Sequence, residues 1–88
     1  MTTQHVAVVN QLGMHARAAA KFVKLAGTFA SQIRVTRGQR TVDGKSILGL
    51  LLLAAARGSA IDIAADGSDE AQALDALCAL VERGFEEA

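Results

Sequence analysis

Two side chains near the start of the chain, His15 and Arg17, have the types and spacing needed to handle a phosphoryl group. Gly13 precedes them, and the pattern predicts a helix that begins at Ala16. Free backbone N–H groups and the helix dipole favour an anion at a helix N-terminus. A neutral imidazole there is a nucleophile, and the guanidinium adds a cation that can pair with phosphate. The residues alone leave two interpretations open, a phosphoryl acceptor and a histidine that only caps the helix.

A second polar residue, Ser46, stands before a short predicted helix and is a plausible N-cap for it. Four apolar side chains share one face of that helix: Ile47, Leu48, Leu51 and Leu52. An exposed apolar patch on a small domain indicates a surface that binds a partner. The alternative is that Ser46 is only a cap, that Leu50 and Leu53 carry the packing, and that the other four side chains fill gaps.

Four other features of the sequence favour plain structural roles. Gly44-Lys45-Ser46 matches the end of a Walker A phosphate loop, but Gln39 stands where that motif needs Gly. The spacing of a calcium loop is absent from the cluster of four acids Asp62, Asp66, Asp69 and Glu70. His5 alternates with apolar residues, which predicts a solvent-facing strand position. The single Cys78 excludes an intramolecular disulfide and a Cys-based zinc site, and we expect it to be buried and inert.

The pattern along the chain predicts four strands and three helices that would position these residues. Strands are expected at 4–9, 31–37, 40–42 and 60–65. Helices are expected at 16–27, from 47 onward, and at 70–84, with Gly27 as a C-cap and Ser68 or Asp69 as an N-cap. The last helix has an apolar stripe formed by Ala71, Leu74, Leu77, Cys78 and Val81. The tight turn at Gly38 makes the central strands antiparallel, so a two-layer α+β fold follows.

The composition excludes several classes of protein. The chain has 88 residues, no net charge, eighteen Ala, and three Phe with no Tyr or Trp. Without a basic excess or aromatic stacking platforms, no nucleic-acid partner is expected. The N-terminus has no signal-peptide pattern, and the longest apolar stretch, 47–56, is far too short to span a membrane. We therefore expect a cytoplasmic protein without membrane insertion and with a core of small side chains.

Two segments, Gly13 to Ala19 (GMHARAA) and Gly44 to Leu50 (GKSILGL), resemble the motifs of a known family. This is the HPr family, the histidine-containing phosphocarriers of the bacterial phosphoenolpyruvate-dependent phosphotransferase system. The first segment resembles its active-site motif and the second its regulatory serine site, and the likeness covers essentially the whole chain. It implies a single domain over residues 1–88, an open-faced two-layer βαββαβα sandwich. The antiparallel sheet would have the order 1-4-2-3, with three helices on one face.

The resemblance also implies a function. His15 would accept a phosphoryl group on its δ1 nitrogen from phosphorylated enzyme I and pass it to enzyme IIA domains, while Arg17 neutralises the phosphate. Ser46 would be the target of an ATP-dependent HPr kinase/phosphorylase. The partner-binding surfaces of the family correspond here to Ala16, Arg17, Ala20, Lys24, Ile47, Leu48, Leu51 and Leu52. The chain would be a monomeric carrier rather than a stand-alone enzyme, and it would need no metal ion or cofactor.

One position departs from the family pattern, because Ala18 stands where the family usually has Pro. Ala has a high helix propensity, so the helix is still expected to form, and the effect falls on the rigidity of the His15 loop. Two other functions stay open. One is a regulatory or nitrogen-related phosphotransfer branch that is not coupled to sugar uptake. The other is a regulatory binding module of the same fold that carries no phosphate on histidine.

Overall fold

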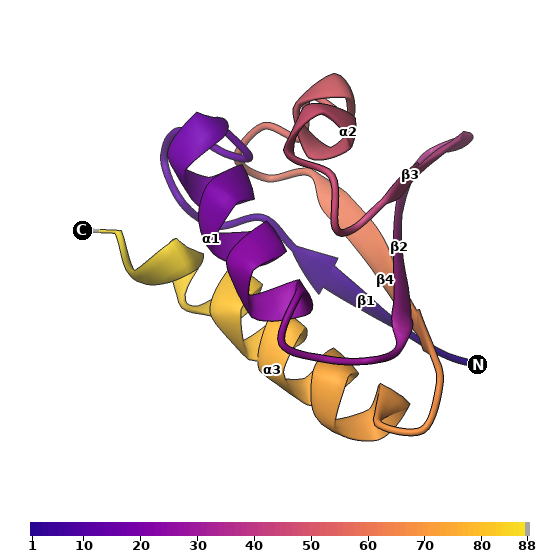
Figure 1. Cartoon of the computed structure of the whole chain (residues 1–88). Helices are drawn as coiled ribbons and strands as arrows, with labels where there is room; N and C mark the ends of the chain where they lie inside the picture. The colour runs from indigo at the N-terminus through magenta and orange to yellow at the C-terminus, as the bar shows by residue number, and fades with distance from the viewer. Residues whose placement is uncertain (88) are drawn as a thin grey trace.

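Four antiparallel strands form one sheet in the order β1-β4-β2-β3, and helices cover one of its faces (Figure 1). The structure is a computed structural model, which describes residues 1–87. The strands are β1 (Thr2–Ala7), β2 (Gln32–Arg37), β3 (Arg40–Asp43) and β4 (Ala60–Asp66). The helices are α1 (Ala16–Ala26), α2 (Ile47–Leu52), α3 (Glu70–Glu82) and a short 3₁₀ turn, η1 (Gly84–Glu86). The predicted open-faced sandwich and its strand order are confirmed.

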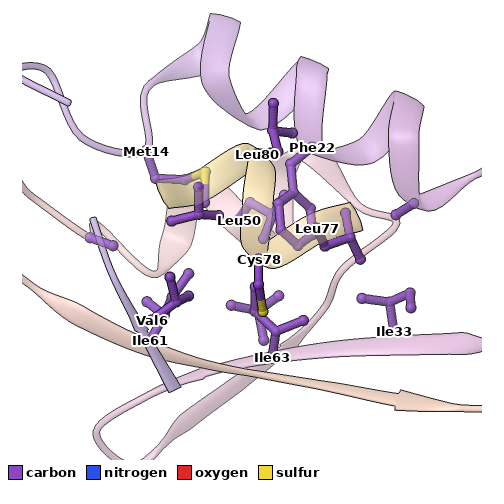
Figure 2. Close-up of a cluster of buried hydrophobic side chains, with 14 of the residues drawn as sticks. Val6, Met14, Phe22, Ile33, Leu50, Ile61, Ile63, Leu77, Cys78 and Leu80 are labelled. Carbon is purple, nitrogen blue, oxygen red and sulfur yellow. The ribbon is translucent and has the colours of Figure 1, made fainter. Parts of the chain in front are cut away.

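The core lies between the sheet and the helical layer (Figure 2). Burial alternates along β4, where Ile61, Ile63 and Ala65 face the helices, as the two-residue period of a strand requires. From the other side, Phe22 and Leu77 close the core, and both are fully buried. Small side chains let the layers approach closely, as predicted: five alanines have no exposed surface, namely Ala18, Ala19, Ala26, Ala65 and Ala73.

Within the described residues 1–87, the other face of the sheet carries no helix and is polar. One row of paired residues crosses all four strands in the order His5, Asp62, Thr36, Thr41. The Nδ1 of His5 lies 2.6 Å from a carboxylate oxygen of Asp62, and the hydroxyls of Thr36 and Thr41 are 2.8 Å apart. The side chain of His5 is 70% exposed, which confirms the predicted solvent-facing position.

Three predicted boundaries were wrong by two residues: the start of β1, which is Thr2 and not position 4, and the ends of β1 and α3. The others differ by at most one. Strand β1 ends at Ala7, not at position 9, because its partner strand β4 begins at Ala60; Val8 instead exchanges hydrogen bonds with the turn at residues 58–59. Helix α3 ends at Glu82, not at position 84. Gly84 adopts a left-handed φ of 65°, which breaks the helix and turns the chain back toward the core.

The N-terminus of α3 also differs from the prediction. Asp69 occupies the N-cap position, but its side chain makes no cap hydrogen bond. Its carboxylate instead accepts hydrogen bonds from the backbone N–H groups of Ala30 and Ser31, at 2.8 and 3.0 Å, and from the Ser31 hydroxyl. The carboxylate therefore joins α3 to the loop before β2. Ala71, which was predicted to belong to the apolar stripe, is exposed, and Ala73 is buried in the stripe instead.

Candidate functional site

The loop between β1 and α1 places His15 by a close approach of two backbones. Gly13 has a left-handed φ of 67°, and a Cβ built on it would lie 2.5 Å from the Ala55 carbonyl oxygen. Only glycine fits such a position. The next residue, Met14, donates its N–H to that same carbonyl at 2.9 Å and buries its side chain. The loop is thus fastened to the segment that follows α2, and His15 becomes the N-cap of α1.

The ring of His15 has a hydrogen-bond partner at each nitrogen and is 22% exposed. The Arg17 backbone N–H donates to Nδ1 at 3.3 Å, and Nε2 lies 2.7 Å from a carboxylate oxygen of Glu87. A backbone N–H can only donate, and an ionised carboxylate can only accept. Both contacts are satisfied by one neutral tautomer, with the proton on Nε2 and the lone pair on Nδ1.

Arg17 extends beside the ring with its side chain 75% exposed. Its Nε lies 3.9 Å from the same Glu87 oxygen that contacts His15. Lys21, one turn further along α1, donates from Nζ to the Phe85 carbonyl oxygen at 2.8 Å. A surface pocket of about 360 Å³ lies here, lined by Gln11, Leu12, Arg17, Lys21 and Glu87. The predicted pair of His15 and Arg17 is therefore brought together at one rim of the molecule.

The sequence analysis missed two residues of this site, Asn10 and Glu87. The side-chain amide of Asn10 is buried and donates to the Gly13 carbonyl oxygen at 2.7 Å and to Glu87 at 2.8 Å. The hydrogen bond from Asn10 is the largest cause that lowers the pKa of Glu87, and the hydrogen bond from His15 adds to it. No local pattern marks Glu87, which lies 72 positions from His15 in sequence. The apolar Phe85 beyond the helix end was the available signal that this segment folds back.

The structure confirms Ser46 as the N-cap of α2. Its Oγ accepts a hydrogen bond from the Gly49 N–H at 3.0 Å. Leu50 and Leu53 carry the packing of this helix and are 0% and 2% exposed. The other four apolar residues form the predicted exposed patch, and the alternative in which they fill gaps is wrong, because they face solvent. Their exposed fractions are 43% for Ile47, 67% for Leu48, 37% for Leu51 and 56% for Leu52, and we call these four residues the α2 patch.

The predicted surface residues of α1 also face solvent. Ala16, Ala20 and Lys24 are exposed, and their spacing of four places them along one face of the helix. Helices α1 and α2 pack against each other (Figure 1), so this face and the α2 patch belong to neighbouring elements. Ala18 lies on the opposite side of α1 and is fully buried.

Outside this site, the single thiol and the acidic side chains are the groups that could carry chemistry. Cys78 is buried, as predicted, and burial together with the charges of Glu82 and Asp75 raises its pKa to about 11, which suppresses the reactive thiolate. Within residues 1–87, no group of three His, Cys, Asp or Glu side chains is arranged to hold a metal ion. Among the same residues, no helix has the length and apolar character needed to cross a membrane.

Comparisons with known proteins identify the family of the chain. A family model described as "PTS HPr component phosphorylation site" matches residues 2–83. Phosphocarrier protein HPr of Cupriavidus necator is 47% identical over 87 residues, covering 99% of this chain and 98% of that protein. Phosphocarrier protein NPr of Shewanella violacea is 42% identical over 85 residues, covering 97% and 93%. The crystal structure of HPr-C-His from Thermoanaerobacter tengcongensis matches with a TM-score of 0.96 at 39% identity, covering 100% and 99%. The chain therefore belongs to the HPr family of phosphocarrier proteins of the phosphotransferase system.

Proposed function

We propose that this chain accepts a phosphoryl group on Nδ1 of His15 from phosphorylated enzyme I and passes it to enzyme IIA domains. One observation carries the proposal: the hydrogen bonds of the ring assign the proton to Nε2 and leave the lone pair on Nδ1. That lone pair would form the new N–P bond, while the P–N bond of the donor phosphohistidine breaks and its electron pair stays on the donor ring.

The surroundings of Nδ1 suit a phosphoryl group. The Arg17 N–H that now donates to Nδ1 becomes free for a phosphoryl oxygen once the lone pair is used. Among residues 1–87, the guanidinium of Arg17 makes a single long contact, 3.9 Å to Glu87, and its exposure suits it to neutralise the new charge. Both donors come from α1, whose N-terminus adds the positive end of its dipole.

The α2 patch and the exposed face of α1 would form the partner surface for enzyme I and enzyme IIA domains. Ser46, at the edge of the α2 patch, would be the site at which an HPr kinase/phosphorylase controls that docking. The chain would act as a single domain and a monomer in the cytoplasm, as its family resemblance implies. The exposure of the α2 patch supports the docking assignment.

A second candidate function has one observation in its favour. The 42% identity to a phosphocarrier named NPr points to the nitrogen-related branch, in which the same histidine would serve regulation rather than sugar uptake. Transfer assays with enzyme I and enzyme IIA proteins of both branches separate the two functions. Faster transfer in the nitrogen-related assay would favour this second function. A regulatory module that carries no phosphate on histidine would take none from either donor.

The histidine assignment is tested with a matched pair of variants, His15→Ala and His5→Ala. Both remove one imidazole, but His5 lies on the bare sheet face, where its pairing with Asp62 is exposed. With phosphoenolpyruvate and enzyme I, we expect acid-labile, base-stable phosphate on the wild type and on His5→Ala, and none on His15→Ala. Circular dichroism should show that both variants are folded. Label on the folded His15→Ala protein would contradict the assignment.

A further inference from the structure

The geometry points to Glu87 as a positioning residue for the acceptor histidine. We infer that its carboxylate keeps the proton on Nε2 of His15 and stabilises the positive charge that the ring gains when Nδ1 is phosphorylated. The inference rests on the proposed function and names a residue that neither of the two signature motifs contains.

Both oxygens of the Glu87 carboxylate are in use. One accepts from Nε2 of His15 at 2.7 Å and the other from the Asn10 amide at 2.8 Å. Asn10 in turn is fixed by its second hydrogen bond, to the Gly13 carbonyl oxygen in the loop that carries His15. The carboxylate and the imidazole are therefore both attached to the loop that carries His15. Three short hydrogen bonds fix their relative position.

The segment that carries Glu87 is anchored. Phe85 is fully buried in the core with a left-handed φ of 57°, and Lys21 donates to its carbonyl oxygen at 2.8 Å. The Glu87 N–H donates to the Gly84 carbonyl oxygen at 3.1 Å, which closes the turn. The side chain of Glu87 is only 16% exposed, so solvent screens its contact with His15 less than it screens a contact between two exposed side chains.

The charges of the site rearrange when a phosphoryl group arrives. Before transfer the ring is neutral, and Glu87 faces the guanidinium of Arg17 at 3.9 Å. Afterwards Nδ1 carries phosphorus, the proton stays on Nε2, and the ring is cationic. The carboxylate can then pair with the ring, which leaves Arg17 to the phosphoryl oxygens. Glu87 exchanges one cation for another without a change in its own protonation.

Two pairs of variants test this inference against a purely structural role. Glu87→Gln removes the charge but keeps an oxygen that can accept from Nε2, and Glu86→Gln removes the charge of an exposed neighbour. We expect Glu87→Gln to lower the equilibrium constant for phosphoryl transfer from enzyme I by about threefold to tenfold, the effect of replacing a charge-assisted hydrogen bond by a neutral one. Glu86→Gln should leave it unchanged. Equal constants for the two variants would overturn the inference.

The tautomer is tested without phosphate, by ¹⁵N NMR of the His15 ring in the neutral state. Wild type and Glu86→Ala should show the proton on Nε2, whereas Glu87→Ala should move both ring shifts toward an average of the two tautomers. The methyl and ring signals around Phe85 report whether the segment stays packed. A proton on Nδ1 in the wild type, or unchanged ring shifts in Glu87→Ala, would overturn the inference. If the wild type took no phosphate, the proposed function would fail, while these ring shifts would still decide the tautomer.

Discussion

At the scale of single residues, the hydrogen bond at Nδ1 of His15 is long enough to be given up easily. The Arg17 backbone nitrogen lies 3.3 Å from Nδ1, slightly beyond the usual range, whereas Nε2 lies 2.7 Å from Glu87. On the proposed function, attack by Nδ1 would break the weaker of the two contacts and keep the stronger one. A cap that holds the ring in place can in this way also present a nucleophile.

Removal of the guanidinium should slow transfer without unfolding the protein. A charge-assisted hydrogen bond to phosphate is worth about 1.5–3 kcal/mol, so Arg17→Ala should reduce the transfer rate by about tenfold to a hundredfold. Its stability should stay close to that of the wild type, because the side chain is 75% exposed and its ion pair is long. Stopped-flow transfer to an enzyme IIA domain measures the rate. Arg83→Ala, an exposed arginine after α3, is the control, and equal rates for both would remove Arg17 from the mechanism.

At the scale of elements, local sequence patterns predicted the helices, strands and turns, whereas contacts between distant residues decide which partners some side chains bind. The cap at Ser46 and the antiparallel hairpin around Gly38 follow from residues within a few positions of each other, and both were predicted. The role of Asp69 was not, because its partners lie 38 and 39 positions away, in the loop before β2. Glu87 was missed for the same reason, since only the folded chain brings it to His15. The sequence therefore pointed to His15 but not to Glu87, which is hydrogen-bonded to its ring.

The first turn of α1 should accept the proline that the family usually has there. Ala18 is the third residue of the helix, and its N–H donates to no acceptor among residues 1–87. Ala18→Pro should therefore raise the free energy of unfolding by about 0.4–1 kcal/mol, because Pro restricts the unfolded chain. Ala20→Pro is the contrast and should cost about 3 kcal/mol, because it removes a helical hydrogen bond. Urea unfolding measures both. A loss of stability in Ala18→Pro would show that the buried site cannot hold the ring.

Charge and cap at α2 can be separated by two substitutions of Ser46. Asp is as good an N-cap as Ser, so Ser46→Asp should keep the stability of the protein, whereas Ser46→Ala should lose about 0.5–2 kcal/mol. The new carboxylate lies beside the α2 patch and must be desolvated when a partner docks. We therefore expect Ser46→Asp to raise the KM of enzyme I for this carrier and Ser46→Ala to leave it unchanged. If Ser46→Ala raised this KM in steady-state kinetics and Ser46→Asp did not, Ser46 would be a cap and nothing more.

At the scale of the whole molecule, carboxylates that accept hydrogen bonds from residues far away in the sequence make the free energy of unfolding depend on pH. The hydrogen bond from the Ser31 side chain, followed by that from the Ala30 N–H, lowers the pKa of Asp69 below its ordinary value of 3.8. The hydrogen bond from Thr2 is the main cause that lowers the pKa of Glu70. A lowered pKa means that the folded state binds fewer protons. The resulting stability is complete above the unfolded pKa and is lost as the pH falls through the folded one.

The acid limb of the stability curve should therefore depend on Asp69. Asp69→Asn cannot titrate, so its free energy of unfolding should be lower at neutral pH and should fall less steeply than that of the wild type below about pH 4. Asp66→Asn is the matched control, because the Asp66 side chain is 64% exposed and its ion pair with the N-terminus is 3.9 Å long. Thermal unfolding between pH 2 and pH 7 measures the slopes. Parallel curves for Asp69→Asn and the wild type would contradict this account.

His15 lies at the start of α1, and the α2 patch lies on the helix that packs against α1. This arrangement has a consequence for the order in which partners bind. On the proposed function, donor and acceptor would need the same surface, so one must leave before the other arrives. Steady-state kinetics should then be of the ping-pong type, with no complex of three proteins. Turnover would then be limited by how fast each partner dissociates. A higher affinity of either partner would slow dissociation and so reduce turnover. A docking surface used twice in each cycle works best when it binds briefly.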